Sequence, residues 1–377
     1  MKDIKMVDLK GQHQKIKKEI DTEISKVIES TAFINGSIVN EFAHDFEEYL
    51  KVKHVIPCAN GTDALQVAMM ALDLKPGDEV ISPDFTFVAT VETIALLRLK
   101  PKLIDVDPDT FTIDPKKIEK SITKNTKAII PVHLYGQCAN MEEILKLAEK
   151  YNLAIIEDTA QATGTDYIFN NGEKKKAGTN GDLGCTSFFP SKNLGAYGDG
   201  GALFTNDDEL AEKLRYIVNH GMKARYYHDF IGVNSRLDSI QAAVLKVKLK
   251  YLDEYSKARQ KVANQYDYAF KMHEKLSVPV NAPWSTHTYH QYTLKLKNVD
   301  RDQVQKKLAE KAIPAMIYYP VPIHRQKAYA SEEYLESEFV ATNELSQTVL
   351  SLPIHTEMEG DQIDYITDNL IQILNSL

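Results

Sequence analysis

The sequence predicts an α/β fold built on a mostly parallel sheet, followed by a smaller α+β domain. Between residues 55 and 205, short apolar runs alternate with amphipathic segments of helical period. Continuous apolar strands joined by helices are typical of a parallel sheet that is covered on both faces. After residue 207 the pattern changes to long helical stretches with few strands. The length of 377 residues agrees with two or three domains of ~150 residues each.

The elements of the first part follow from periodicity and length. Each predicted strand is a short apolar run, and together they cover 78–83, 101–107, 127–136, 153–158, 183–189 and 200–205. The predicted helices between them cover 64–72, 91–100, 114–122 and 141–150. Asn140, with Glu143 three residues later, predicts a capping box at the start of the last of these helices.

A long helical stretch over 236–272 joins the two parts, because apolar residues recur there at i, i+3 and i+4. We therefore place a domain boundary near 250. Residues 1–250 form the large domain, which begins with a helical segment, and residues 251–377 form the small one. A helix is expected at 207–220 and a Pro-containing linker at 277–284. Two segments of the small unit are expected at 290–297 and 313–320. Two helical stretches end the chain.

Composition excludes several classes of protein. Hydrophobic residues make up 43% and charged residues 26% of the chain, which are ordinary globular values and argue against disorder. A net charge of -8 argues against a protein that grips nucleic-acid backbone. No apolar run approaches a membrane span, and the charged N-terminus lacks a signal-peptide segment. The three cysteines are isolated and suggest neither disulfides nor a zinc site. We expect a cytoplasmic protein without a bound metal.

Four polar clusters fall where predicted strands end, which is the edge where open α/β sheets bind ligands. The first is Asn60-Gly61-Thr62-Asp63, at the start of a helix. Free backbone N–H groups and the helix dipole suit a phosphate there. The same residue types also make an ordinary helix cap, and the sequence leaves both interpretations open.

The second cluster is Glu157-Asp158, directly after an apolar strand. Side chains alternate along a strand, so the two carboxylates must face opposite ways. One of them suits a metal ligand, a general base or the partner of a heterocyclic nitrogen. A solvated acid at the end of a strand is the alternative.

The third cluster places Lys192 in a Gly-rich loop between two apolar strands, five residues after Ser187. A lysine among apolar groups has a lowered pKa and can act as a nucleophilic amine, whereas most lysines are solvated surface residues. The fourth cluster is the loop that contains Asn234 and Arg236 and opens the long helix. Its arginine suits a bidentate carboxylate or phosphate contact, or a surface salt bridge.

These parts together match the needs of pyridoxal phosphate (PLP), which requires a lysine, a phosphate cup, a carboxylate for the pyridine nitrogen and a stacking partner. The segments GTDAL, EDTAQ, SFFPSKNLG with GDGGAL, and NSRLDSIQAAVL resemble the motif set of the DegT/StrS-type sugar aminotransferases. The likeness runs from FINGSIVNEF to about 323–326. It implies PLP fold type I, with a mostly parallel seven-stranded sheet in the large domain. CANGTDALQ, LYGQC, TSFFPSK and GVNSRLD look closest to transaminases of 3-keto UDP-N-acetylhexosaminuronic acids.

The resemblance assigns roles to the cofactor side of the site. Lys192 would form the Schiff base with PLP and later carry the proton, and Asp158 would contact the pyridine nitrogen. Gln161 would lie near the phenolic oxygen, and Phe87 would stack on the ring. The phosphate would be bound at Gly61, by the backbone of Thr62 and Asp63, by the hydroxyl of Ser187, and by Asn234 of a neighbouring subunit.

On the substrate side, the resemblance implies His220, Arg236, Tyr318 and Tyr319. Many relatives carry His-Tyr-Pro where this chain reads Tyr318-Tyr319-Pro320, which puts the exact sugar in doubt. The implied protein is a homodimer with shared active sites. It would aminate a nucleotide-linked keto sugar, with glutamate as donor, for surface polysaccharide such as O-antigen or capsule.

Three other functions stay open from the sequence. The first is amination at C3 or C4 of a dTDP- or GDP-linked keto-6-deoxyhexose. The second is a 3-dehydratase on the same fold, which Lys192 argues against, because such relatives carry His at that position. The third is a non-catalytic regulator on this fold, against which the intact lysine, carboxylate and phosphate cup also argue.

Overall fold

The computed structural model describes residues 2–377 and contains a seven-stranded sheet in the order β1-β9-β8-β5-β4-β2-β3. All the strands of the sheet run parallel except β9, which is antiparallel to both β1 and β8. The mostly parallel seven-stranded sheet predicted from the sequence is therefore confirmed. The strands are β1 His54–Cys58, β2 Glu79–Pro83, β3 Lys100–Ile104, β4 Thr126–Ile129, β5 Ala154–Asp158, β8 Leu183–Ser187 and β9 Gly201–Thr205.

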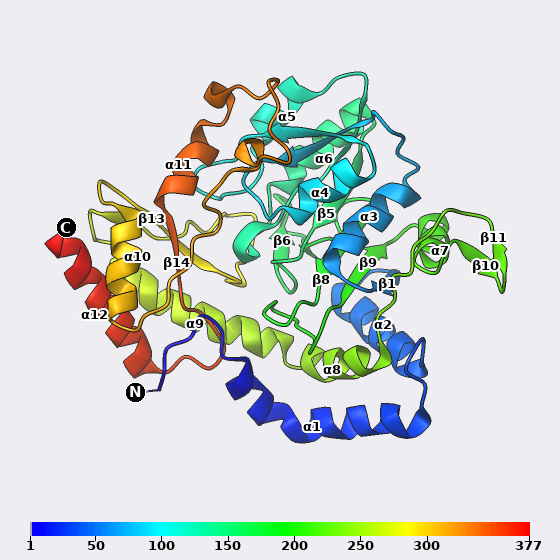
Figure 1. The fold of residues 1–377 in the computed structure, drawn as a ribbon, viewed down its shortest axis with the longest axis horizontal. Coiled ribbons are helices and arrows are strands. Elements are labelled where there is room, and N and C mark those ends of the chain that lie inside the picture. Colours follow the sequence, from blue (N-terminus) through cyan, green and yellow to red (C-terminus); the bar gives the residue numbers. More distant parts are fainter. Residues whose placement is uncertain (1) are drawn as a thin grey trace.

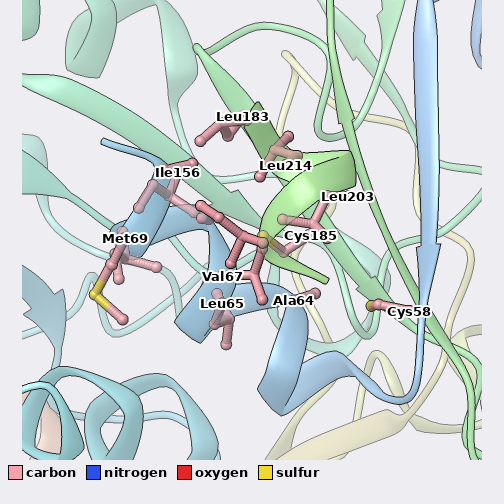
Figure 2. Close-up of a cluster of buried hydrophobic side chains, with 14 of the residues drawn as sticks. Cys58, Ala64, Leu65, Val67, Met69, Ile156, Leu183, Cys185, Leu203 and Leu214 are labelled. Carbon is pink, nitrogen blue, oxygen red and sulfur yellow. The ribbon is translucent and has the colours of Figure 1, made fainter. Parts of the chain in front are cut away.

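Helices cover both faces of this sheet (Figure 1). The N-terminal and sheet-covering helices are α1 Leu9–Ser30, α2 Ser37–Leu50, α3 Gly61–Ala71, α4 Ala89–Leu96, α5 Pro115–Ser121, α6 Met141–Tyr151 and α7 Asp208–Ile217. Consecutive residues of a strand enter different cores, as β2 illustrates: Val80 packs with α3, α4 and α7, whereas Ile81 packs with α5 and α6. Figure 2 shows Leu65, Val67 and Met69 of α3 in the first of these cores, beside Leu203 of β9.

The C-terminal part has its own core around a three-stranded antiparallel sheet. Its elements are α9 Leu252–Phe270, β12 Leu276–Ser277, β13 Tyr292–Leu296, α10 Arg301–Glu310, α11 Val340–Thr348, β14 Val349–Leu352 and α12 Gly360–Ser376. Two small hairpins leave the large region, formed by β6 Asp166–Ile168 with β7 Lys174–Lys176 and by β10 Met222–Ala224 with β11 Tyr227–His228. None of the helices within residues 2–377 combines the length and apolarity that a membrane span requires.

Three local predictions need correction. The long helix is two helices, α8 Ser239–Leu249 and α9, and the break at Lys250 lets α8 lie along α1 while α9 runs to the small sheet (Figure 1). The sequence hides this break because no Gly or Pro marks it. The helix predicted over 91–100 begins and ends earlier, at Ala89 and Leu96, since Arg98 has a left-handed φ of 59°.

The predicted capping box is also wrong. Helix α6 does begin after Asn140, but the side chain of Asn140 accepts no hydrogen bond from the first amides of the helix. Its Oδ1 atom instead accepts a hydrogen bond from the hydroxyl of Tyr167 at 3.2 Å. That same hydroxyl accepts the amide N–H of Glu142 at 2.9 Å. A side chain from the β6 hairpin therefore caps the helix.

Candidate active site

A cavity of about 870 Å³ opens at the carboxyl edge of the large sheet. The name floor is used here for nine cavity-lining residues of the large region. They are Asn60, Gly61, Thr62, Asp63, Phe87, Asp158, Gln161, Ser187 and Lys192. We call the residues of the C-terminal part the wall, which consists of His290, Gln291, Tyr318 and Tyr319. The cavity therefore gathers ten of the thirteen predicted site residues around one space.

Lys192 lies on the loop that connects β8 to β9. The loop is tightly wound, because a Cβ at Gly195 would come within 2.3 Å of the carbonyl oxygen of Pro190. The side-chain nitrogen of Lys192 has no hydrogen-bond or ion-pair partner in the described part of the chain. Burial lowers the pKa of this amine to about 8, and the nearby charge of Asp158 opposes the shift only in part. A much larger fraction of this amine is therefore neutral near pH 7 than of an ordinary lysine.

Glu157 and Asp158 face opposite sides of β5, as their alternation predicts. Asp158 lines the cavity, where its carboxylate accepts hydrogen bonds from the Thr90 hydroxyl at 2.8 Å and the Ala160 amide at 3.1 Å. Glu157 is fully buried on the other side and accepts the ring nitrogen Nε2 of His133 at 2.8 Å. Burial opposes the charged form of Glu157, but the bonds to His133 and to the loop 178–181 outweigh it and hold the pKa of Glu157 below its usual range.

The first turn of α3 forms one end of the floor. Asn60 caps this helix by accepting the amide N–H of Asp63 at 2.8 Å, so the amide of Asp63 is already used. The amides of Gly61 and Thr62 have no intrahelical partner, because they begin the helix. Gly61 lies so close to Ser187 that a Cβ would meet the Ser187 Cβ at 2.7 Å. Two free amides at a helix N-terminus thus lie beside a hydroxyl in one concave place. The motif is therefore both an ordinary helix cap and a suitable site for a phosphate.

The remaining predicted floor residues contact the wall. Phe87 is 52% exposed although it is aromatic, and its ring centroid lies 6.2 Å from that of Tyr319. Gln161 donates from Nε2 to the Tyr319 hydroxyl at 3.0 Å and accepts the Tyr135 amide at 2.8 Å. The hydroxyl of Tyr135 in turn donates to the backbone oxygen of Tyr318. Two floor residues therefore contact Tyr319 of the wall directly.

Sequence reasoning missed two wall residues, His290 and Gln291. His290 is only 6% exposed, lines the cavity, and shares a hydrogen bond of 3.2 Å between Nδ1 and the Asn193 Oδ1 atom. Burial, and then the charges of Lys192 and Arg259, hold the pKa of His290 well below its ordinary value. His290 and Gln291 directly precede strand β13, and no local signal in the sequence marks them.

Three predicted residues do not reach the cavity of their own chain. His220 and Asn234 are exposed, on segments that flank the β10–β11 hairpin. Arg236 lines a different hollow of about 350 Å³, together with Arg215 and residues of α2. A single chain thus leaves the phosphate contact of Asn234 and the substrate contacts of His220 and Arg236 untested.

The floor fits PLP. An amine of lowered pKa, a carboxylate fixed by Thr90, an exposed aromatic face and an anion-binding turn lie around one cavity, as that cofactor requires. Lys192 would hold the cofactor, Asp158 would contact its ring nitrogen, and the turn of Gly61 and Thr62 with Ser187 would hold its phosphate. When bound, PLP supplies an aldehyde that joins to amines and a ring that withdraws electrons.

Comparison with known proteins agrees with this chemistry. The model of the DegT/DnrJ/EryC1/StrS aminotransferase family matches residues 14–371. A UDP-2-acetamido-2-deoxy-3-oxo-D-glucuronate aminotransferase of Pseudomonas aeruginosa is 44% identical over 96% of this chain and 98% of its own. A UDP-N-acetyl-3-dehydro-alpha-D-glucosamine 3-aminotransferase of Acidithiobacillus ferrooxidans is 41% identical over 96% and 95%. A pleiotropic regulatory protein of Geobacillus stearothermophilus is 43% identical over 98% of both chains.

Solved structures extend the agreement to the fold. A DegT DnrJ EryC1 StrS aminotransferase from Brucella abortus matches with a TM-score of 0.92 and 39% identity, over 98% of this chain and 99% of its own. The NtdA protein of Bacillus subtilis, solved with bound cofactor PMP, matches with a TM-score of 0.87 and 31% identity, over 95% and 82%.

Proposed function

This chain belongs to the DegT/DnrJ/EryC1/StrS aminotransferase family, and we propose that it aminates C3 of a UDP-linked 2-acetamido-2-deoxy-3-oxo-uronic acid with glutamate as donor. The general activity is shown by the family: the chain is a PLP-dependent aminotransferase of nucleotide-linked keto sugars. The specific substrate is supported by the 44% identity with the 3-oxo-glucuronate enzyme over nearly the full length of both chains.

The nucleotide and the position of amination are better supported than the carboxylate at C6. UDP and C3 amination are named for both similar aminotransferases, whereas only one name includes a carboxylate at C6. Arg236 is the side chain that we assign to this carboxylate, since its planar fork suits a bidentate contact. Its place outside the cavity of its own chain means that this assignment requires a second subunit.

In this proposal the residues of the floor move the proton and hold the reacting groups. The neutral amine of Lys192 would take a proton from the α carbon of the amino-acid donor in the first half-reaction and would deliver a proton to C3 of the sugar in the second. Asp158 keeps a negative charge at the ring nitrogen, and Thr90 fixes the orientation of that carboxylate. Positioned proton transfer of this kind is worth roughly 10²–10⁴ in rate. The wall, in which Tyr318 and Tyr319 lie, faces the sugar.

We further propose a homodimer in which Asn234, His220 and Arg236 act in the partner's cavity. His220 and Asn234 are exposed on segments away from the cavity of their own chain, and Arg236 lines a separate hollow, which supports this arrangement. The variants Lys192→Ala and Asn234→Asp should each be inactive, because the second sets a carboxylate against a phosphate. Mixing them with subunit exchange should restore part of the activity, since one composite site then carries neither change. A fully active monomer at assay concentration would refute the dimer.

Two other functions remain as alternatives. Amination at C3 or C4 of a dTDP- or GDP-linked keto-6-deoxyhexose needs the same floor and no carboxylate contact. A regulatory role is the second alternative, because one similar protein is named a pleiotropic regulatory protein. The buried amine of Lys192, in a cavity whose lining suits PLP, favours catalysis, and a yellow purified protein would support it further.

The decisive experiment compares three 3-keto UDP-N-acetylhexosamine substrates that carry a carboxylate, a hydroxymethyl or a methyl group at C6, with glutamate as donor and mass spectrometry as readout. We expect the uronic acid to be aminated fastest. Arg236→Lys should then lower kcat/KM for the uronic acid by roughly ten- to a hundredfold, because lysine cannot form a bidentate pair. The same variant should leave the hydroxymethyl substrate unchanged. Equal turnover of the 6-deoxy compound by the natural protein would refute the uronate.

An amino sugar of this kind would serve surface polysaccharide, with synthesis in the cytoplasm. Both statements follow from the proposed substrate. Loss of surface polysaccharide on deletion of the coding sequence, with recovery by the active protein and none by Lys192→Ala, would support the role in surface polysaccharide.

A further inference from the structure

Asp84 and His324 form a buried pair beside the cavity, outside the residues that carry the proposed chemistry. Asp84 directly follows β2 and begins the loop that brings Thr86 and Phe87 to the cavity. His324 belongs to a short turn over Ile323–Arg325, just beyond Tyr319 of the wall. The pair therefore joins the segment that leads into the floor to the segment that leads out of the wall.

The contact between the two residues is extensive. One carboxylate oxygen of Asp84 accepts the backbone N–H of His324 at 2.8 Å, and the other lies 2.6 Å from the ring nitrogen Nδ1. The backbone oxygen of Asp84 also accepts the amide of Ile323 at 3.4 Å. The side chains of Asp84 and His324 are 0% and 2% exposed, and the imidazole stacks on Phe339 at 4.3 Å. Asp84 thus fixes both the backbone and the ring of the turn.

The pair is buried, and burial raises the pKa of the Asp84 carboxyl, which the bonds from His324 offset only in part. Burial opposes the charged ring of His324, but Asp84 and then Glu336 outweigh it and raise the pKa of His324 above its ordinary value. Glu336 lies 3.5 Å from Nε2 and is itself held by Arg325. The negative charge of Asp105, which directly follows the neighbouring strand β3, adds to the rise in the pKa of Asp84. Buried ion pairs contribute little net stability, so their value lies in fixing one arrangement of the segments that they join.

The arrangement that this pair fixes is the packing of the wall on the loop after β2. The ring of Tyr319 contacts the rings of Phe85 and Phe87, with centroids 6.1 and 6.2 Å away. These aromatic contacts are not directional enough to set the position of the wall alone. The floor has its own anchor, the hydrogen bond from Thr90 to Asp158.

We propose that Asp84 and His324 are positioning residues that hold the Tyr318–Tyr319 segment against the loop after β2 and thereby set the affinity of the cavity for the keto sugar. This inference rests on the proposed function, which places the sugar at the wall. Because Lys192 lies on the loop after β8 and Asp158 ends β5, both outside the segments that the pair joins, the reaction with the amino donor should not depend on the pair.

The test uses Asp84→Asn, which keeps the shape and removes the charge, and His324→Gln. Arg325→Gln is the matched control, because it breaks the exposed contact with Glu336 and leaves the buried pair. In the holoenzyme, each Asp84 or His324 variant should raise KM for the UDP-linked 3-keto uronic acid by at least about tenfold. The single-turnover rate with glutamate alone, followed by cofactor absorbance, should stay within about twofold of the natural protein. The control should change neither quantity.

Hydrogen exchange supplies a readout without any sugar. Amides of residues 315–324 should exchange faster in the two variants and not in the control, while those of 58–66 stay unchanged. A wild-type enzyme that aminates no nucleotide keto sugar, with the exchange pattern as expected, would refute the proposed function and leave the positioning role. Equal losses in both half-reactions, unchanged KM, unchanged exchange, or failure of both variants to fold would overturn the inference.

Discussion

The floor and the wall of the cavity are built in different ways. Floor residues lie at the ends of strands, in the loops that follow strands or at the start of a helix, so the hydrogen-bonded sheet positions most of them. Wall residues lie on irregular segments of the C-terminal part, outside strands and helices. Side-chain pairs hold the wall in place, chiefly Gln161 with Tyr319 and Asp84 with His324.

This difference assigns separate tasks to the two regions. Regular elements hold catalytic groups within narrow tolerances, which the cofactor chemistry needs. Irregular segments tolerate change, so a wall of this kind suits the choice of substrate. Changes in the floor should therefore abolish turnover with every sugar, whereas changes in the wall should alter affinity for particular sugars.

The largest expected effect comes from removing the amine of the floor. Lys192→Ala should fold normally and lose turnover by roughly 10²–10⁴, because no second lysine lines the cavity in the described part of the chain. Borohydride reduction followed by peptide mapping should find the pyridoxyl label on Lys192. Lys248 is an internal control, since its pKa is also lowered to about 8 by burial, but it is directed to the Gly195 carbonyl at 2.7 Å. A label on Lys248 would contradict the assignment.

The next effect separates two adjacent carboxylates. Asp158→Asn should lower kcat for all sugars by roughly ten- to a hundredfold, because it removes a charged partner of the cofactor, with little effect on stability. Glu157→Gln should do the reverse and reduce the free energy of unfolding by about 3 kcal/mol, since it breaks a buried pair with His133. Denaturant unfolding and single-turnover kinetics measure the two effects. A loss of stability in Asp158→Asn equal to that in Glu157→Gln would show that both carboxylates are structural.

The pKa of Lys192 predicts a smaller effect of pH. Its amine reacts only when neutral, and burial lowers its pKa to about 8. The neutral fraction therefore rises as the pH rises, by about tenfold between pH 7 and 9. The rate of PLP uptake by the apoprotein, followed by absorbance in stopped flow, should rise with the same midpoint. A midpoint near 10.5 would show that burial does not act on this amine.

The smallest effect tests the bond between floor and wall. Tyr319→Phe removes the hydroxyl that accepts from Gln161 and keeps the ring contacts with Phe85 and Phe87. We expect KM for the keto sugar to rise by about two- to tenfold, which corresponds to one ordinary hydrogen bond. The glutamate half-reaction should stay unchanged. Tyr135→Phe is a matched variant for comparison, because it removes a different hydroxyl, the one that donates to the backbone oxygen of Tyr318.

Most of the floor could be predicted from the sequence, because a strand followed by polar or Gly-rich residues is a local pattern. Lys192, Asp158 and Ser187 all belong to such patterns and all line the cavity. The wall offers no such signal. His290 and Gln291 precede an ordinary strand, and Tyr318 and Tyr319 were reached only through a family resemblance.

Long-range pairs were also out of reach. Asp84 looks like a solvated acid at the end of a strand, and its partner His324 lies 240 positions later. The capping of α6 failed for the same reason, since Tyr167 of a distant hairpin replaced the local partner. In each case a side chain that is remote in sequence outcompeted the local interpretation.

The single antiparallel strand has a consequence for the order of assembly. The loop that carries Lys192 closes only when β9 pairs with β8 and also with β1, whose residues were synthesised about 145 positions earlier. Contacts of such separation form late in folding, since the ends of a long segment must first be brought together. We therefore expect a nascent chain to bind PLP only after Thr205 has left the ribosome, so that cofactor capture reports a completed sheet.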